Sequence, residues 1–112
     1  MVINMDKNEI YENVYDILQL IPLGYVTTYK CLADFLRVHQ RTIAAALRNN
    51  KRHFIIPCHR VIKSNGDLAG YTPYGREAKK ILLISEGVEI IGNKVSEKHI
   101  IRNLSKFLEN YY

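Results

Sequence analysis

The sequence predicts a mainly α domain with short β segments, winged-helix-like, containing a helix-turn-helix and an extra C-terminal helix. Three observations support this. Apolar residues recur at helical spacing in five segments, two of these segments are short and nearly adjacent, and the other apolar runs suit only brief strands. With 112 residues, 47% of them apolar, the chain is long enough for one core, so we expect a single domain over residues 1–112.

The first predicted helix covers residues 7–20. Asp6 and Glu9 form a capping pattern at its start, apolar residues follow at helical spacing, and Pro22 closes the segment. Because these apolar residues fall on one side of the helix, we expect that side to face the core.

The next two predicted helices lie close together in the chain. Thr28 is placed to cap a helix over 29–37, a short break follows over 37–40, and the next helix covers 40–48. Two short helices joined by a tight turn are typical of a helix-turn-helix. Three consecutive alanines in the second helix predict that its exposed face can approach another surface closely.

The second half of the chain alternates loops, helices and short extended segments. Asn65-Gly66 is a turn signal between extended segments, and residues 69–75 are expected to form an irregular loop. A fourth helix is expected to bury Ile81 and to end at Gly87, which supplies a C-terminal stop. The predicted elements here are a helix over 75–86, a strand over 88–91 and a last helix over 97–111.

Charge and hydropathy limit the possible partners. The net charge of +5 favours a polyanion, most often nucleic acid, although a chance excess of surface lysine gives the same number. No apolar run approaches the roughly 20 residues of a membrane span, and the first residues do not form a signal peptide. We therefore expect no membrane partner, a monomer, and a cytoplasmic location that is nucleoid-associated or, in a eukaryote, nuclear.

The two cysteines, Cys31 and Cys58, are too few for a disulfide framework, so we expect free thiols. His59 follows Cys58, but adjacent residues rarely chelate one zinc ion, and we expect no metal and no cofactor. A nearby base makes a thiol a better nucleophile. Strand neighbours point to opposite faces, so a Cys58–His59 contact needs a bend, which Pro57 can supply. These residues alone favour a buried cysteine and a structural histidine.

The segment "IPCHRVI", residues 56–62, resembles the active-site signature of the O6-alkylguanine-DNA alkyltransferases, the methylated-DNA–protein-cysteine methyltransferases. Flanking segments resemble the same family in order and with compatible spacing, over about residues 10–90. They read "IPLGYVTTYKCLADFL", "RTIAAALRNN", "SNGDLAGY" and "KKILLISEG". The signature is specific, and the agreement around it favours membership over coincidence.

The resemblance implies a DNA repair protein that flips O6-alkylguanine out of double-stranded DNA and transfers the alkyl group to a cysteine. Because the thioether product is permanent, each molecule of this methyltransferase would act once. Carried over by position, Cys58 is the acceptor and His59 is the base that draws its proton through a water molecule. Glu86 is the carboxylate that orients His59.

The resemblance also implies how DNA is bound. Arg41 corresponds to a finger that fills the space left by the flipped base. Tyr29 corresponds to the tyrosine that crowds the phosphate 3′ to the target and meets the leaving guanine. Small side chains on the second helix of the pair fit the narrow minor groove. The remaining expected DNA contacts on that helix are Thr42, Ala44 and Ala45.

Further positions correspond to the base pocket and its supports. Tyr71 packs against the guanine, Thr72 offers a hydroxyl near O6, and Leu47 forms an apolar wall. The expected structural residues near the site are Asn50, Pro57 and Arg60.

Two departures from the family pattern bear on the substrate and on the alternatives. Pro73 and Tyr74 stand where small residues are usual; Pro73 has no N–H, and Tyr74 either narrows the pocket or stacks on a bulky alkyl group. The family's usual N-terminal domain is expected to be absent. Alkyltransferase-like proteins also lack it, bind alkylated DNA and recruit other repair without transfer, which makes them the alternative hypothesis. They usually replace the cysteine, so Cys58 favours transfer; a plain DNA-binding module with a structural cysteine is a third hypothesis.

Overall fold

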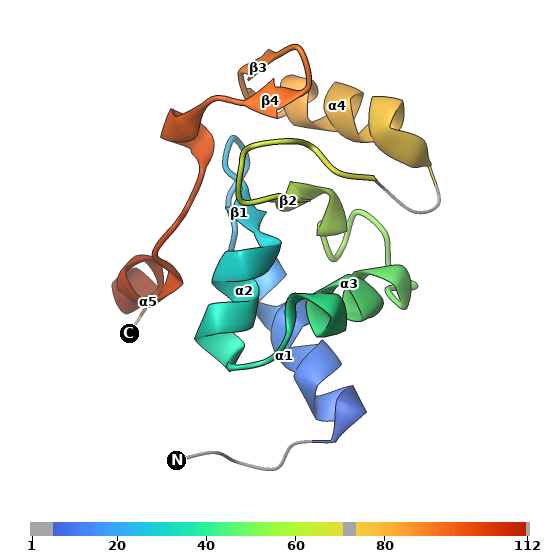
Figure 1. The fold of residues 1–112 in the computed structure, drawn as a ribbon, viewed down its shortest axis with the longest axis vertical. Coiled ribbons are helices and arrows are strands. Elements are labelled where there is room, and N and C mark those ends of the chain that lie inside the picture. Colours follow the sequence, from blue (N-terminus) through green and yellow to red (C-terminus); the bar gives the residue numbers. More distant parts are fainter. Residues whose placement is uncertain (1–5, 71–73, 112) are drawn as a thin grey trace.

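The computed structural model describes residues 6–70 and 74–111, in a mainly helical arrangement that confirms the expected fold class. Figure 1 shows three helices gathered at one end: α1 (Lys7–Leu18), α2 (Tyr29–Leu36) and α3 (Gln40–Arg48). Across the other end lie α4 (Gly75–Ser85) and the hairpin of β3 (Ile90–Ile91) and β4 (Lys94–Val95). The short strands β1 (Thr27–Thr28) and β2 (Val61–Ile62) lie between these two ends. The expected pocket residues Tyr71, Thr72 and Pro73 lie outside the described residues.

The first helix, α1 (Lys7–Leu18), begins with the predicted cap. Asp6 Oδ1 accepts a hydrogen bond of 2.9 Å from the backbone N–H of Glu9. Its buried face, which includes Val14 and Leu18, contacts the core as the spacing predicted. The helix ends before residue 20 because Leu20 N–H donates to the Ile17 carbonyl in a tighter turn.

The predicted pair of short helices is α2 (Tyr29–Leu36) and α3 (Gln40–Arg48). Thr28 caps α2, because its Oγ1 accepts a 2.9 Å hydrogen bond from the backbone N–H of Cys31. Arg37 ends α2 in the left-handed region with φ of 60°, and residues 37–39 turn the chain into α3. The helix-turn-helix prediction is thus confirmed in its extent and in its cap.

A two-stranded parallel sheet joins this helix pair to the segment that carries Cys58. The strand β1 (Thr27–Thr28) pairs with β2 (Val61–Ile62), with Thr27 opposite Val61. Successive strand residues point to opposite faces, so Val61 belongs to the core among α1, α2 and α3, and Ile62 belongs to a second core beneath α4. The sheet therefore fixes the Cys58 segment between the two cores.

The helix α4 (Gly75–Ser85) turns a different face inward from the one predicted. Ile81 was expected to be buried, but 65% of it is exposed, and the fully buried residues are Lys79 and Leu83. The reason is that Lys79 Nζ donates to two backbone carbonyls, which fixes Lys79 and the residue four positions later toward the body. Ile81 lies about 200° around the helix from Lys79 and so faces outward.

After α4, an antiparallel hairpin replaces the single predicted strand over 88–91. Its strands are β3 (Ile90–Ile91) and β4 (Lys94–Val95), with Ile90 opposite Val95. The turn signal at Asn65-Gly66 is also part of this region, because Val95 N–H donates to the Gly66 carbonyl at 2.9 Å.

The prediction of one helix over 97–111 is wrong. The chain forms a 3-10 turn (Glu97–His99), an extended stretch, the short helix α5 (Leu104–Leu108) and a last 3-10 turn (Glu109–Tyr111). Ile101 N–H donates to the Val26 carbonyl at 2.7 Å, and Thr27 Oγ1 donates to the Ile101 carbonyl at 2.9 Å. These long-range bonds hold residues near 101 extended, so the helix starts only after them.

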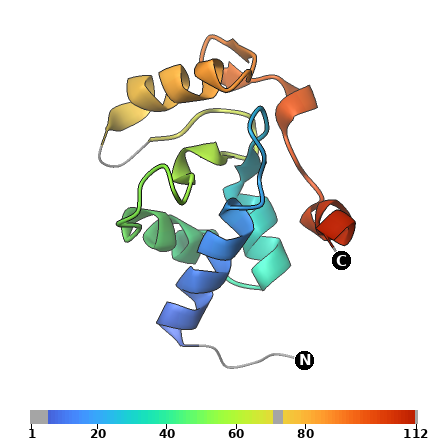
Figure 2. The same ribbon diagram turned by 180° about the vertical axis from the view of Figure 1, so that it is seen from behind.

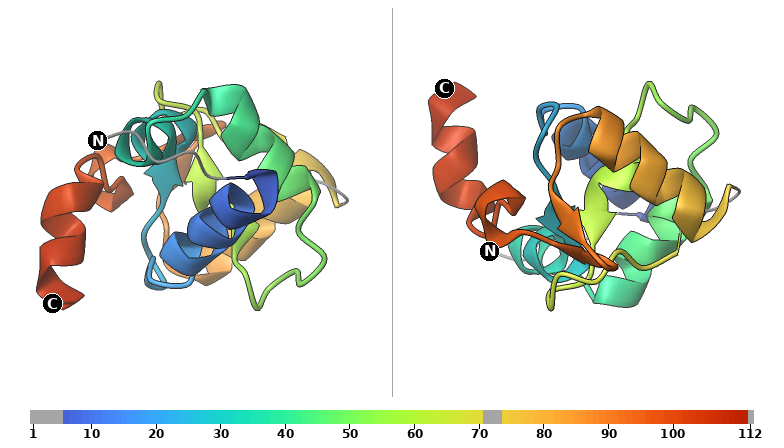
Figure 3. Two further views of the ribbon diagram at one scale, coloured as in Figure 1. Left: turned by 90° about the horizontal axis from the view of Figure 1, so that it is seen from below. Right: turned by 90° about the horizontal axis from the view of Figure 1, so that it is seen from above.

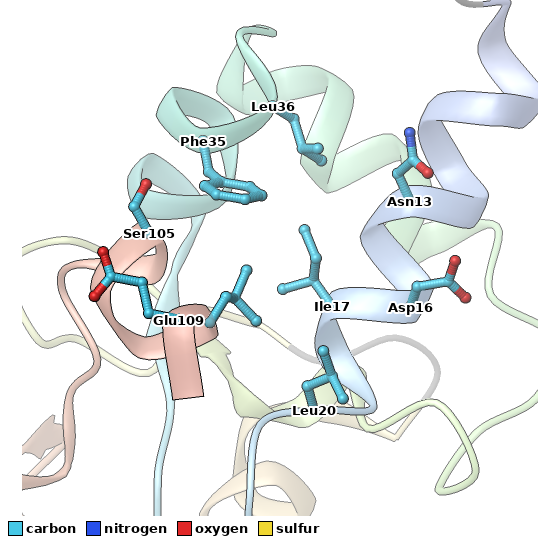
Figure 4. Close-up of a pocket in the computed structure, with 9 residues that line it drawn as sticks. Asn13, Asp16, Ile17, Leu20, Phe35, Leu36, Ser105 and Glu109 are labelled. Atoms are coloured by element: carbon cyan, nitrogen blue, oxygen red, sulfur yellow. The ribbon is translucent and has the colours of Figure 1, made fainter. Parts of the chain in front are cut away.

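Figures 2 and 3 show α5 standing to one side of the three-helix cluster. Between α5, α1 and the end of α2 lies an apolar hollow of about 640 Å³ (Figure 4). Its walls include Ile17, Leu20, Phe35 and Leu108, with Asp16 among the polar residues that line it. Within 6–70 and 74–111, no helix is both long and apolar enough to cross a membrane.

Candidate functional site

Cys58 and His59 lie on a single 3-10 turn (Cys58–Arg60) that follows Pro57. Cys58 N–H donates to the Ile56 carbonyl at 2.8 Å, and Arg60 N–H donates to the Pro57 carbonyl at 3.0 Å. Consecutive side chains on such a turn are about 120° apart, instead of opposite as in a strand. Both side chains can therefore enter the interior, where Cys58 is 4% and His59 is 2% exposed.

Glu86, which ends α4, reaches back to this turn. Its Oε2 lies 2.8 Å from His59 Nε2, and Arg60 donates to both carboxylate oxygens, from Nε at 2.9 Å and from Nη2 at 3.0 Å. Arg60 Nη1 also donates to the Ile21 carbonyl at 2.7 Å. The side chain of Arg60 thus ties the carboxylate to the chain just after α1, a role that the sequence did not reveal.

The charge of Glu86 determines which nitrogen of His59 carries the proton. Burial raises the pKa of Glu86, but hydrogen bonds and positive charge from His59 and Arg60 outweigh it and lower that pKa to about 2. A carboxylate can only accept, so His59 Nε2 donates to Glu86 at neutral pH. In the neutral ring, Nδ1 is then the basic nitrogen that can take a proton.

The loop before the turn is held by Asn50, which is 2% exposed. Asn50 Nδ2 donates to the Ile56 carbonyl at 3.0 Å, and its Oδ1 accepts from Arg52 N–H at 2.9 Å. Inside this loop, Phe54 adopts the left-handed region with φ of 72°, which is rare for a bulky residue. Asn50 therefore braces a strained segment that leads directly to Cys58.

Tyr74 packs against the same loop. Its ring stacks on Phe54 with centroids 6.1 Å apart, and it meets the ring of His53 edge-on at 5.7 Å. These contacts join the start of α4 to the loop that precedes Cys58, and they leave 53% of Tyr74 exposed.

A groove of about 520 Å³ brings α3 together with the loop after β2. Tyr29, Arg41 and Ala44 line it, together with Asn65 of the predicted turn. Four further lining residues were not expected there: Gln40, Lys63, Ser64 and Ala69. Burial raises the pKa of Tyr29, and nearby Cys58 raises it further. Tyr29 also packs against the core that contains Cys58, which connects the groove to that core. The Asn65-Gly66 signal predicted the turn in this loop, but no local signal could have placed the loop beside α3.

Other expected site residues have different surroundings. Thr42 and Ala45 are half-buried on α3 and do not line this groove. Leu47 is 9% exposed and belongs to the same core as Cys58.

Lys79 is a residue of the site that sequence reasoning missed. It is 1% exposed, and its Nζ donates to the Val61 carbonyl at 2.6 Å and to the Gly70 carbonyl at 3.2 Å. These bonds join the strand after the Cys58 turn to the loop before residue 71. Burial lowers the pKa of Lys79 to about 7, against an opposing effect of nearby Cys58. A lysine in an amphipathic helix normally lies at the surface, so the spacing of apolar residues did not indicate that Lys79 is buried.

Lys79→Met is expected to remove a pH dependence of stability. In the parent, the unfolded chain binds more protons than the folded one between pH 7 and the ordinary lysine pKa of 10.5. The free energy of unfolding therefore rises with pH, by at most about 1.4 kcal/mol per unit from this group. Urea denaturation at several pH values should show this rise in the parent and in Lys80→Met, but not in Lys79→Met. Equal slopes in the parent and in Lys79→Met would contradict it.

The fold and the site together define a helix-turn-helix domain with a buried thiol beside a histidine–carboxylate pair. Residues 9–88 match the family described as 6-O-methylguanine DNA methyltransferase, DNA binding domain, and the chain belongs to this family.

Curated relatives agree with this membership. The chain is 49% identical over 67 residues to a methylated-DNA–protein-cysteine methyltransferase of Pyrobaculum aerophilum, covering 60% of this chain and 45% of the relative. It is 42% identical over 88 residues to one of Saccharolobus solfataricus, covering 79% and 57%. The chain thus spans about half the length of the curated relatives that it matches.

Two solved structures illustrate what this chain resembles in three dimensions. S. pombe Atl1, in complex with damaged DNA containing O6-carboxymethylguanine, has a TM-score of 0.77 and 28% identity, covering 87% of this chain and 98% of Atl1. The O6-methylguanine-DNA methyltransferase of Pyrococcus kodakaraensis has a TM-score of 0.65 and 37% identity, covering 70% and 46%.

Proposed function

We propose that this protein repairs double-stranded DNA by taking the alkyl group of O6-alkylguanine onto Cys58, once per molecule. The observation that carries the proposal is the buried Cys58–His59 turn with Glu86 bound to His59, in a chain of this family. In the transfer, the bond between the alkyl carbon and O6 breaks and a carbon–sulfur bond forms. The thiol proton ends on the departing guanine, so the base is restored and the thioether remains.

The site residues divide this chemistry among them. Cys58 is the nucleophile, and His59 takes its proton at Nδ1 through a water molecule. Glu86 holds the imidazole in the tautomer that leaves Nδ1 basic, and Arg60 keeps Glu86 ionised. We place Leu47, Tyr71 and Thr72 around the flipped base, with the Tyr74–Phe54 stack limiting the space for large alkyl groups.

DNA contacts extend over α3 and the groove beside it. Arg41 enters the base stack, Tyr29 lies against the backbone 3′ to the lesion, and Thr42, Ala44 and Ala45 face the minor groove. Such contacts read backbone and lesion more than sequence. We further propose that residues 1–112 act as one monomeric domain in the cytoplasm, associated with the nucleoid, or in the nucleus of a eukaryote.

A second candidate function is lesion binding without transfer, as a signal for excision repair. The observation that favours it is the likeness to Atl1, which was solved with damaged DNA and nearly all of whose chain is covered. Cys58 and its histidine–carboxylate pair favour transfer.

Intact-mass measurement separates the two functions. The protein is incubated with duplex DNA containing O6-methylguanine and then weighed. The transfer proposal requires a gain of one methyl group in a fixed, stoichiometric amount. Tight binding to the lesion with no gain in mass would reject transfer and favour the second function. Equal affinity for damaged and undamaged DNA, again with no gain in mass, would reject both and favour a plain DNA-binding module.

Arg41→Ala is expected to slow transfer from DNA much more than transfer from free O6-benzylguanine. Arg41 is exposed on the first turn of α3, outside the buried Cys58 turn, so its loss should impair base flipping and leave the thiol intact. Rates with the two substrates, measured for Arg41→Ala and for Arg37→Ala as a control, test this. Equal slowing with both substrates would remove Arg41 from the flipping role.

A further inference from the structure

A second, polar hollow of about 380 Å³ continues from the groove beside α3. Ser64 lines both, and Tyr29 of the groove is followed in the chain by Lys30 of the hollow. The side chains around the hollow are mostly polar, and they come from three separate parts of the chain. They include Lys30, Cys31 and Asp34 from α2, Ser64 from the loop after β2, and Arg102 from the C-terminal segment.

The C-terminal part of this lining is firmly attached. The Arg102 carbonyl accepts a hydrogen bond of 3.2 Å from Cys31 Sγ, and Ile101 N–H donates to the Val26 carbonyl at 2.7 Å. Arg102 is thereby held beside the first turn of α2. It lies outside residues 9–88, the part of the chain that the family model matches.

The guanidinium of Arg102 is oriented by Glu97. Glu97 accepts from its Nε and from its Nη2, the latter at 3.0 Å, and this pair does not use Nη1. Lys30, on the facing side, is paired with Asp34 at 2.7 Å, with 59% of its side chain exposed. Exposed pairs of this kind contribute little, so a phosphate can take over either cation at small cost.

We propose that Arg102, with Lys30, binds a phosphate of the DNA backbone next to the groove, so that the C-terminal segment forms part of the DNA interface. This inference rests on the proposed function, because it takes the groove beside α3 as the place where DNA lies. A strand that passes Tyr29 continues into the hollow, where the hydroxyl of Ser64 and two cations can contact the next phosphate. Arg102 would contribute affinity without sequence preference.

The salt dependence of binding to an undamaged duplex tests the proposal. Each phosphate contact contributes about 0.9 to the slope of log Kobs against log salt concentration. Arg102→Gln should lower the magnitude of that slope by about 0.9, which corresponds to roughly eightfold weaker binding at 0.1 M salt. Arg102→Lys should retain most of the slope.

Lys98→Gln is the matched control. Lys98 lies in the same C-terminal segment and is paired with Glu89 at 3.9 Å, but it does not line the hollow. Its change to glutamine removes the same single positive charge as Arg102→Gln. Its slope should stay at the parent value; equal slopes for Arg102→Gln and Lys98→Gln would overturn the proposal. All variants should react with free O6-benzylguanine at the parent rate. Because undamaged DNA reports the phosphate contact and benzylguanine reports the transfer, failure of one proposal is distinguishable from failure of the other.

Discussion

Cys58→Ala is expected to bind DNA containing O6-methylguanine and to gain no methyl group. The thiolate of Cys58 is the proposed acceptor, and alanine offers no atom that can form the new bond. The side chain is 4% exposed within the core among α1, α2 and α3, and the change removes one sulfur atom. The cavity should cost about 1 kcal/mol of stability, so the variant should remain folded.

Cys31→Ala is the natural control for this experiment. Cys31 is the other free thiol and is half-buried on α2, where its Sγ contacts the Arg102 carbonyl. The Cys31→Ala variant should gain the methyl group as the parent does. A gain in mass by Cys58→Ala, or its loss in Cys31→Ala, would assign the acceptor elsewhere. Circular dichroism of both variants, recorded before the reaction, shows that each is folded.

Local signals predicted the helical half of the fold. The caps at Asp6 and Thr28 depend on residues three positions apart, and both hydrogen bonds are present. The prediction was wrong at the C-terminus, where residues near 101 bond to Val26 and Thr27, some 75 positions earlier in the chain. Spacing within one segment contains no information about such a partner.

In the candidate site, too, features set by local sequence were predicted and features set by distant contacts were not. Pro57 was recognised as a bend, and the 3-10 turn after it buries both Cys58 and His59. Arg60 was expected near the site, but its contacts, like the burial of Lys79, were not predictable, because these side chains are held by distant backbone or by Glu86. Glu86 itself was found through the family resemblance, since composition and spacing do not connect residues 27 positions apart.

The position of Glu86 suggests why Arg60 is needed. Glu86 follows the last turn of α4, where the helix dipole disfavours a negative charge. The bidentate contact with Arg60 and the bond from His59 compensate for this and keep the carboxylate ionised. Removing the charge of Glu86 should therefore affect the tautomer of His59 and the stability of the domain together.

Glu86→Gln is expected to slow methyl transfer by roughly 10²-fold, within the range that a positioned base contributes. Glutamine has the same shape, but its amide no longer stabilises the imidazolium that forms when His59 takes the thiol proton. Because Glu86 lies outside the groove beside α3, affinity for damaged DNA should be nearly unchanged. Single-turnover rates and binding curves measured on one preparation check both statements. An unchanged rate would remove Glu86 from the proton path.

The same variant should lose a stabilisation that depends on pH. The pKa of Glu86 is about 2 in the folded protein, below its ordinary value of 4.5. Its stabilisation is therefore fully present above pH 4.5 and is lost as pH falls from 4.5 toward 2. Glu86→Gln should lower the free energy of unfolding at pH 7 by about 2 kcal/mol, after allowance for solvent screening. The free energy of unfolding of Glu86→Gln should also fall less steeply in acid than that of the parent.

Glu77→Gln, an exposed change in the first turn of α4, should follow the parent curve in urea denaturation. Parallel curves for Glu86→Gln and the parent would show that His59 and Arg60 do not hold the carboxylate as the structure describes.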